Sequence, residues 1–408
     1  MFRQKVMSFY DQKIVLVSTL DTKGEETAYL KNRAEKAGRS VCVVDVGTSG
    51  TPAFCADITR QTVREQTSLP LQSVGASVAL EAMSAGLEII LRDLFDRDDI
   101  SAVVGIGGGK GASVFHRATM GLPYGFPKLL VTSARPAMLA EIAMTTDTIL
   151  FPTLVDLFGV NKFTRAVLDN AAAMLSGLNW IAEKEIPVKT VAVTAFGVTT
   201  PAVRSVKSNL EQAGIAVIVF PANGAGGRTM EALIARGAFD GVIDLTTTEM
   251  ADLLLGGTAS AGEERLKAAG AIGIPQVVVP GATDMVNFGP PETVPDRFSD
   301  RTKYQHTPLT TLVRTTPSDT AQIAKMTSER LNLSSSAVAV FWPGGGVSDY
   351  DSPGQDFYDP DANTAWLIEM KRSLNTKVRL IETDHHINHP DFALLCSNWM
   401  ITQLEARK

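Results

Sequence analysis

Short apolar runs recur along the whole chain, each followed by a turn rich in Gly, Thr, Ser or Asp and then by a longer helical pattern. This alternation is typical of a parallel β-sheet covered by helices, because parallel strands need long crossover connections. In the first half it predicts helices over residues 24–37, 74–95 and 111–120, and strands over residues 14–18, 41–46, 102–106, 128–132 and 147–151. The sequence therefore predicts an α/β fold.

The pattern restarts after AEKEIPVKT at residues 182–190, a charged stretch with a proline that ends a candidate helix over 161–181. The second half predicts a last helix near 391–405 and strands over residues 191–195, 215–220, 241–245, 276–280, 337–342 and 377–382. A chain of 408 residues also exceeds the size at which one core usually stops growing. We expect two Rossmann-like domains with parallel sheets, residues 1–185 and 186–408, and an interdomain cleft.

The composition of the chain limits the classes of molecule that it is expected to bind. The net charge of −6 argues against an extended cationic surface for nucleic acid or anionic lipid. The N-terminal MFRQKVMSFYDQK is too polar for a signal peptide, and no apolar run approaches the length of a membrane span. Cys42, Cys55 and Cys396 match no metal or redox spacing. We expect a cytoplasmic protein that binds a small molecule and neither nucleic acid nor a membrane.

A glycine-rich stretch, VVGIGGGKGASVF at residues 103–115, joins a predicted strand to a predicted helix. It is not a P-loop, because Gly111 replaces the Ser or Thr that should follow Gly109-Lys110, and Val104 stands where the first glycine is needed.

A dinucleotide fingerprint is met in part by Gly107, Gly109 and Ala112, but the next predicted strand ends in TSA at 132–134 without an acidic residue for the ribose. An NAD-dependent oxidoreductase is therefore a less favoured alternative. Glycine amides at a helix N-terminus still suit a phosphate group. The other interpretation is a glycine-rich turn that binds nothing.

Polar or small residues follow several other predicted strands, and the carboxyl ends of parallel strands meet at one edge of a sheet. This combination suits a nucleotide with its phosphates and a cation such as Mg²⁺. Asp21-Thr22 also fits a helix N-cap, and Lys110 also fits a solvated lysine. The predicted nucleotide site comprises Thr19, Asp21, Thr22, Lys23, Gly47, Thr48, Gly107, Gly108, Gly109, Lys110, Gly111, Ala112, Ser113, Thr132, Ser133 and Asp147.

Five stretches carry a family resemblance: STLDTKGEE at 18–26, GIGGGKGAS at 105–113, NGAGGRTMEALI at 223–234, PGATDMVNFG at 280–289 and WPGGGVSDYDSPGQDFYDPDAN at 342–363. In this order they resemble the Tm-one-like ATP-binding domain family, which includes the N-terminal half of a plant tobamovirus-resistance protein and many bacterial proteins. The resemblance implies two Rossmann-like subdomains, ATP binding in the first, and self-association, here as a homodimer.

The implied ATP site maps onto Thr19, Asp21, Thr22 and Lys23 and onto residues 107–113. The family's loop commonly carries a small residue followed by Gly-Gly-Thr, whereas this chain has GKGAS at 109–113. Lys110 therefore either strengthens phosphate binding or crowds the phosphate.

The second half repeats the strand, glycine turn and helix at PANGAGGR, residues 221–228. Gly224, Gly226, Gly227 and Arg228 are predicted to bind a second anion, a carboxylate or phosphate. The candidate catalytic residues are Asp284, His306, Arg228 and Arg314. Alternatively, Asp284 and Asn287 only shape the loop before the next two prolines.

Two further stretches are rich in possible metal ligands. His385, His386 and His389 lie among acidic residues, but the proline after His389 indicates the start of a helix, so we predict no metal site. The acidic stretch at 349–363 lacks the register of a calcium loop, and we predict a surface loop capped by Asp359 or Asp361.

Two classes of function remain. One is an ATP-dependent or phosphate-ester enzyme that acts on a small anionic metabolite in the interdomain cleft. The other is a non-catalytic nucleotide-binding module that regulates closure or assembly. Release of ADP or AMP that depends on an added metabolite would distinguish them.

Overall fold

The computed structural model describes residues 12–67, 75–180 and 188–407. The chain divides into two compact units, Met1–Lys184 and Glu185–Lys408, and each is described by itself. The domain boundary predicted between residues 185 and 186 lies outside the described residues.

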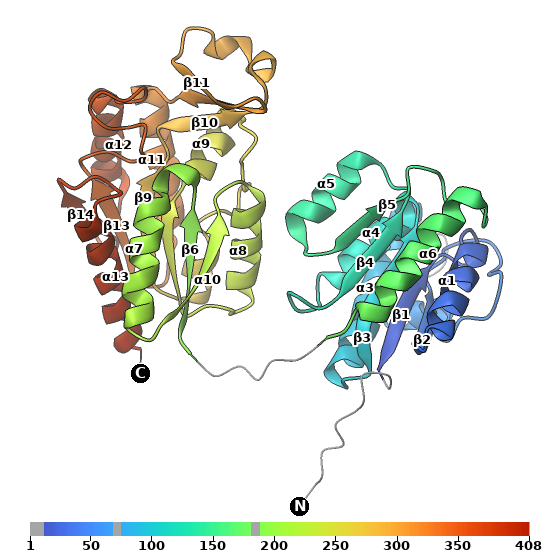
Figure 1. The fold of residues 1–408 in the computed structure, drawn as a ribbon. Coiled ribbons are helices and arrows are strands. Elements are labelled where there is room, and N and C mark those ends of the chain that lie inside the picture. The colour runs from blue at the N-terminus through green and yellow to red at the C-terminus, as the bar shows by residue number, and fades with distance from the viewer. Residues whose placement is uncertain (1–11, 68–74, 181–187, 408) are drawn as a thin grey trace, which may run out of the picture. The chain divides into compact units, whose positions relative to one another are not determined.

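The first unit contains a five-stranded parallel sheet with the order β2-β1-β3-β4-β5 (Figure 1). Its strands are β1 (Lys13–Ser18), β2 (Val41–Asp45), β3 (Ile100–Gly107), β4 (Lys128–Thr132) and β5 (Ile149–Pro152). Its helices are α1 (Gly24–Lys36), α2 (Arg60–Glu65), α3 (Ala76–Asp96), α4 (Gly109–Thr119), α5 (Pro136–Thr145) and α6 (Lys162–Gly177).

Helices cover both faces of this sheet, so its central strand must be apolar on both sides. All eight residues of β3 are buried. Val15 and Val103 face a core formed with α3 and α4, whereas Ile14 and Val104 face a core formed with α1 and α6. This two-sided burial explains why the strands appear in the sequence as continuous apolar runs.

The second unit contains a six-stranded parallel sheet with the order β14-β13-β9-β8-β6-β7. Its strands are β6 (Thr190–Ala195), β7 (Ala216–Pro221), β8 (Gly241–Thr246), β9 (Gln276–Gly281), β13 (Val338–Pro343) and β14 (Arg379–Thr383). One face packs against α7 (Thr200–Gln212) and α13 (Pro390–Glu405). The other packs against α8 (Ala225–Ala235), α9 (Thr248–Leu255), α10 (Ala268–Ile272), α11 (Pro317–Leu331) and α12 (Pro360–Ser373).

A small antiparallel sheet with the order β10-β12-β11 adds to this unit after β9 (Figure 1). It consists of β10 (Met285–Phe288), β11 (Lys303–Thr307) and β12 (Thr310–Arg314). The remaining short elements are the 3₁₀ turns η1 (Gly197–Thr199), η2 (Pro291–Thr293) and η3 (Asp296–Phe298). The sequence analysis missed this sheet, because β10 has only four residues and β11 is largely exposed and polar.

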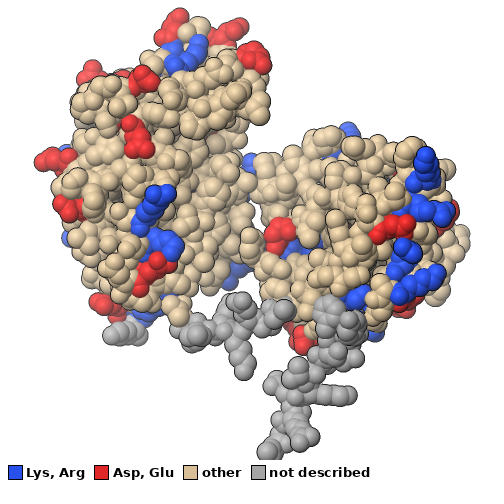
Figure 2. All heavy atoms as spheres, in the orientation of Figure 1, with Lys and Arg blue, Asp and Glu red and all other residues tan. Residues whose placement is uncertain are grey.

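The predicted fold class is confirmed: the chain is an α/β protein with two separate parallel sheets. Asp359 caps α12 by accepting hydrogen bonds from the amides of Asp361 and Ala362, as predicted. On the face shown in Figure 2, basic and acidic side chains are interspersed. Within the described ranges, the helices are too short or too polar to cross a bilayer.

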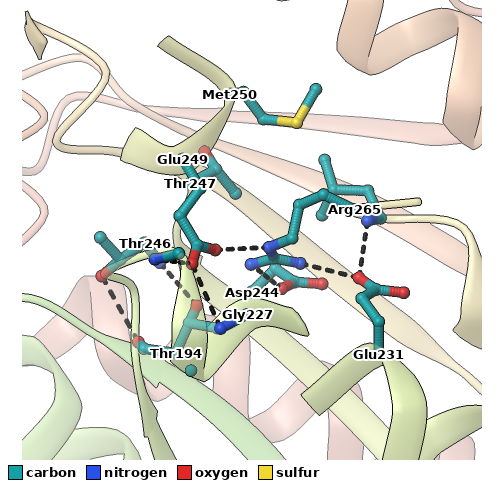
Figure 3. A network of polar contacts seen from close by, with 12 residues as sticks. Thr194, Gly227, Glu231, Asp244, Thr246, Thr247, Glu249, Met250 and Arg265 are labelled. Atoms are coloured by element: carbon teal, nitrogen blue, oxygen red, sulfur yellow. Dashed lines mark hydrogen bonds and ion pairs between the residues drawn. The ribbon is translucent and has the colours of Figure 1, made fainter. Parts of the chain in front are cut away.

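One buried arginine organises the polar interior of the second unit (Figure 3). The Arg265 side chain is fully buried and forms ion pairs with Asp244 at 2.6 Å, Glu249 at 2.6 Å and Glu231 at 3.1 Å. These carboxylates come from β8, α9 and α8. Burial raises the pKa of Glu231, while the Arg265 guanidinium opposes this shift. The network therefore links three elements through one cation.

Replacing Arg265 by leucine should strongly destabilise the second unit, because three carboxylates would lose their shared counterion. Breaking a buried ion pair typically costs on the order of 3–5 kcal/mol. Urea unfolding followed by tryptophan fluorescence measures the loss, since Trp342, Trp366 and Trp399 all lie in this unit. The control Lys325→Leu, which removes an exposed pair with Glu329, should change stability by less than about 1 kcal/mol. Equal effects of the two substitutions would contradict this role of Arg265.

Candidate functional site

In the first unit the strand order reverses between β1 and β3, because β1 connects to β2 on one side and β3 continues toward β4 on the other. Open α/β sheets bind ligands beyond the carboxyl ends of the strands at such a switch point. The loop after β1 contains Thr19–Lys23, and the loop after β3 contains Gly108 and leads into α4. The two stretches that sequence analysis favoured most therefore flank the switch point.

Asp45, at the end of β2, holds the neighbouring loops in place. Its Oδ1 accepts hydrogen bonds from the amides of Leu20 and Gly47 at 3.1 and 2.9 Å. Its Oδ2 pairs with Nε of Arg60 at 2.6 Å. A Cβ at Gly47 would lie 2.5 Å from Nη2 of Arg60, so the glycine leaves room for this arginine. The predicted site residue Gly47 thus has a packing role.

The glycines of the β3–α4 loop fall into two groups. A Cβ at Gly105 would lie 2.6 Å from the Phe115 ring, and one at Gly107 would lie 3.0 Å from Cα of Gly111. These two glycines allow close packing of strand and helix. A Cβ at Gly109, by contrast, would meet no other atom of the described residues within 4 Å, and one at Gly108 would only come within 3.9 Å of the Ser133 hydroxyl.

Neither of these two positions needs glycine for its backbone. Gly108 has φ −80°, and Gly109 is helical. The amides that follow belong to the first turn of α4, where a helix offers no internal acceptor. Lys110 is exposed beside them, Gly111 and Ala112 are buried, and Ser113 is half-buried. The exposed start of α4 therefore leaves its backbone open to close approach.

Three predicted residues of the β1–α1 loop have partners within the unit. The hydroxyls of Thr19 and Thr22 lie 2.8 Å apart. Lys23 donates to the backbone carbonyl of Leu157, and its Nζ lies 4.0 Å from the carboxylate of Asp156. The structure thus directs Lys23 to the loop after β5.

Asp21 in the same loop is less satisfied. Its Oδ2 accepts a hydrogen bond from the Ser49 hydroxyl at 3.4 Å. Its Oδ1 is buried and has no hydrogen-bond partner in the described part of the chain. Asp21 is therefore a carboxylate of this edge with one oxygen that no described donor satisfies.

Thr132 and Ser133, at the end of β4, mainly support the edge. The Thr132 hydroxyl is fully buried, donates to the carbonyl of Gly107 at 2.6 Å and accepts from the amide of Ala134. The Ser133 hydroxyl donates to Asp156 at 2.8 Å. Thr48 lies beyond β2, where its carbonyl accepts from Arg64 at 3.4 Å. Thr132 positions the β3–α4 loop rather than offering its hydroxyl to a ligand.

The structure removes Asp147 from the predicted site. Asp147 precedes β5 and pairs at 2.8 Å with the buried Lys128 at the start of β4, and it accepts from the amide of Gly125 at 2.5 Å. Both partners belong to the amino edge of the sheet. The sequence analysis grouped Asp147 with residues at the carboxyl ends of strands, although Asp147 stands at the start of the strand predicted over 147–151 and therefore at its amino end.

The structure also corrects the predicted second anion site. The carboxylate of Glu249 accepts hydrogen bonds from the amides of Gly224 at 2.8 Å and Gly227 at 3.2 Å, so the start of α8 already binds an anion of the chain itself. A Cβ at Gly227 would overlap this carboxylate, and one at Gly226 would overlap the carbonyl of Pro221. Arg228 donates to the carbonyl of Ser260 at 3.2 Å.

Asp284 and Arg314 form a buried cluster. The Ser348 hydroxyl donates to Asp284 at 2.7 Å, and Arg314 donates to the carbonyls of Phe357 at 2.7 Å and Asp284 at 3.2 Å. Burial raises the pKa of Asp284 to about 7, the Asp351 carboxylate adds to the shift, and Arg314 opposes it. These two candidates hold the β9–β10 junction, whereas His306 belongs to β11 and lies 3.2 Å from the Tyr350 hydroxyl through its Nδ1.

Asp252 is a buried carboxylate that the sequence analysis did not identify. It accepts hydrogen bonds from the amide of Ala259 at 2.9 Å and from Nδ2 of Asn287 at 2.8 Å. Burial raises its pKa to about 7 in spite of these donors. It lies one helical turn after Glu249 in α9, but the apolar sequence around it gave no signal of a partner.

Two histidines and an aspartate, side chains of the kinds that bind metal ions, lie close together at the start of α13. Atoms of His385, His389 and Asp391 that could bind a metal lie within 4.8 Å of one another. Nδ1 of His389 accepts from the amide of Asp391 at 3.2 Å and thereby caps the helix. The proline-based expectation of a helix start is correct, and the prediction of no metal here stays a prediction.

The raised pKa of Asp252 predicts how stability depends on pH. The folded state holds this proton more tightly than the unfolded chain between about pH 4 and pH 7, so the free energy of unfolding should fall as pH rises through this window. Asp252→Asn should remove that component and make the fall from pH 5 to pH 7 smaller, by up to roughly 2 kcal/mol. Urea unfolding at the two pH values measures it. In the control Asp296→Asn, which changes an exposed carboxylate, the free energy of unfolding should depend on pH as in the wild type. The same pH dependence in Asp252→Asn would refute the role assigned to Asp252.

Comparison with known proteins matches both halves of the chain to one family. Residues 12–184 match the N-terminal domain, and residues 188–404 the C-terminal domain, of the "Uncharacterised protein family (UPF0261)". A UPF0261 protein of Clostridium tetani is 37% identical over 402 residues, which cover 97% of this chain and 100% of the relative.

The ToMV resistance protein Tm-1(GCR237) of Solanum lycopersicum is 35% identical over 410 residues, which cover 93% of this chain and 54% of the tomato protein. A crystal structure of UDP-N-acetylglucosamine 2-epimerase aligns with 10% identity over 90% of this chain and 92% of that one, at a TM-score of 0.25, which is too low to support an inference. The tomato relative confirms the resemblance found in the sequence motifs. The chain belongs to the UPF0261 family, and the tomato resistance protein is its homologue.

Proposed function

We propose that the first unit binds an adenine nucleotide, ATP, with its phosphates at the N-terminal end of α4. One observation carries this proposal: the loops after β1 and β3 flank the switch point of the sheet, and the second exposes a helix start at Gly108 and Gly109. The sequence resemblance to an ATP-binding domain family supports the same ligand.

The start of α4 has the physical properties that a phosphate needs. Amides of the first turn point out of the helix without internal acceptors, and the helix dipole favours negative charge there. Because Gly108 and Gly109 carry no side chain where space is open, a phosphate oxygen can approach these amides closely. The fold itself does not require glycine at either position, so ligand access is the reason we assign to both.

In the proposed site, a lysine binds the phosphates and an aspartate binds the accompanying cation. Lys110 is the lysine expected to contact the phosphates, since Lys23 is bound to the carbonyl of Leu157. For a Mg²⁺ ion that accompanies ATP, the Asp21 carboxylate on this loop is an oxygen ligand of the kind that this ion prefers. Thr19 and Thr22 present exposed hydroxyls on the same loop.

The proposal concerns binding and assigns no reaction. Asp284 and Arg314 are buried and hydrogen-bonded within the second unit, which assigns them a structural role rather than contact with a substrate. An ATP-dependent enzyme and a regulatory module both remain predictions. Assays of ADP release distinguish these two, and sedimentation velocity tests the homodimer implied by the resemblance.

Calorimetric titration of ATP with Mg²⁺ tests the proposed site. Gly109→Val should abolish measurable binding, because the new side chain covers the amides of the first turn. Lys110→Ala should weaken binding roughly 10-fold to 150-fold, since one charge-assisted contact contributes on the order of 1.5–3 kcal/mol. The amide contacts remain in this second variant, so its loss should be the smaller one.

Gly177→Val is the matched control. Gly177 ends α6 in the same unit, is exposed, and would place its Cβ at least 4 Å from the other described atoms. Its ATP affinity should equal that of the wild type. Wild-type affinity in a correctly folded Gly109→Val protein would show that the nucleotide binds elsewhere, and that the glycines only form a turn.

A further inference from the structure

The second unit contains a cavity of about 330 Å³ beside its small antiparallel sheet. The cavity lies between loops that follow β6 and β7, the segment after α9, and residues of β10, β11 and β12. Its volume falls at the lower end of small-molecule sites, which hold about 300–1,000 Å³. It is lined by Phe196, Gly197, Val198, Asn223, Thr258, Ala259, Asn287, His306, Thr310, Leu312 and Tyr350.

Asn287 lines this cavity, and its side-chain oxygen lacks a hydrogen-bond donor among the described residues. The residue is buried, with an exposed fraction of 3%. Its Nδ2 donates to Asp252 at 2.8 Å and lies 3.4 Å from the Thr248 hydroxyl. Its Oδ1 is buried, and no donor of residues 12–67, 75–180 or 188–407 reaches it. A buried acceptor without a donor is unfavourable by about 1–3 kcal/mol, so this atom favours a ligand that donates a hydrogen bond.

Asp252 fixes which end of the Asn287 amide points away from it. Above about pH 7, where Asp252 is mostly ionised, its carboxylate only accepts hydrogen bonds, so it faces the NH₂ group and the amide oxygen faces the other way. Asp252 also accepts from the backbone amides of Asn287 at 3.3 Å and Ala259 at 2.9 Å, and both residues line the cavity. The carboxylate therefore holds two parts of the wall from behind.

The remaining wall combines the aromatic residues Phe196, His306 and Tyr350 with small, aliphatic and neutral polar residues. The Tyr350 ring packs against Tyr304 with centroids 4.7 Å apart, and its hydroxyl lies 3.2 Å from Nδ1 of His306. Burial raises the pKa of Tyr350 to about 12, so it stays neutral. No Lys, Arg, Asp or Glu side chain is among the described residues that line the cavity. An anion there would face no lysine or arginine of the described residues, so it would lose hydration without gaining a permanently charged partner.

We propose that this cavity is a second binding site, which takes a small neutral molecule with one ring and an N–H or O–H donor. The ring packs against Phe196 and Tyr350, and the donor bonds to Oδ1 of Asn287. The site is independent of the nucleotide site proposed in the first unit. It also replaces the anionic ligand expected from the sequence in this half of the chain, because Glu249 occupies the amides on which that expectation rested.

Benzamide and benzoate are suitable probes, because they share one shape and differ at the polar group. Benzamide carries an N–H donor and no charge, whereas benzoate is an anion with acceptors only. Saturation-transfer NMR with the full chain should show transfer to benzamide and none to benzoate at equal concentration. Stronger transfer to benzoate, or no transfer to benzamide, overturns the proposal.

Two variants locate the bound probe. Gly197 lines the cavity, and a Cβ there would meet no atom of the described residues within 4 Å, so Gly197→Leu should fill the cavity without a clash and abolish benzamide binding. Gly177→Leu, in the other unit, should leave binding unchanged. Asn287→Leu should weaken benzamide binding roughly 3-fold to 10-fold, as expected for the loss of one neutral hydrogen bond.

Asn287→Leu also removes a donor from Asp252, so its folding is checked by circular dichroism before titration. If that variant does not fold, Gly197→Leu still decides the location. Undiminished benzamide binding in folded Gly197→Leu overturns the proposal, and so does undiminished binding in folded Asn287→Leu.

Discussion

The interaction on which the second unit most depends is the contact of one guanidinium with three carboxylates. Arg265 binds Oε2 of Glu249, while Oε1 of the same carboxylate accepts hydrogen bonds from the amides at the start of α8. One turn further along α9, Asp252 orients Asn287 and the segment that contains Ala259. The ion pairs in the core are therefore connected, through one short helix, to the wall of the cavity. A change at the Arg265 ion pairs is therefore expected to affect the position of Asn287 in the cavity wall as well.

Both units contain a glycine-rich turn between a parallel strand and a helix, but the two turns differ in what binds the helix start. In each, a parallel strand runs through a glycine-rich turn into a helix whose first amides lack internal acceptors. At α8 the acceptor is Glu249, and the surrounding glycines are required by that carboxylate and by nearby backbone. At α4, Gly108 and Gly109 have open space where a side chain would be. The same sequence pattern therefore gives an internal cap in one unit and an accessible helix start in the other.

The parallel sheets could be predicted because their strands are buried on both faces, which leaves a continuous apolar signal in the sequence. β3 shows this at each of its eight positions. The antiparallel sheet could not be predicted in the same way, since KYQHT in β11 is mostly exposed. The edge of the first sheet was predictable from the turn residues after each strand, whereas Asp147 was misplaced because it precedes its strand and pairs with Lys128 at the start of β4.

Side-chain partners were beyond the sequence pattern. Nothing near Glu249 indicates that it reaches the α8 turn, and nothing near Asp252 indicates that it meets Asn287, because both contacts join residues more than twenty positions apart. Such contacts depend on the three-dimensional path of the chain, which local propensity does not encode. The cavity was missed for the same reason, since its lining comes from seven separate stretches.

β11 is an edge strand of the small sheet, because it pairs with β12 on one side only. It also carries His306, which lines the cavity. A strand with one neighbour and exposed side chains has few contacts to break, so its local opening requires less free energy than opening of the parallel sheet. Hydrogen exchange at the β11 amides is therefore expected to be faster than at β8 or β9. His306 therefore belongs to the part of the cavity wall whose backbone opens most readily, while the parallel sheet stays folded.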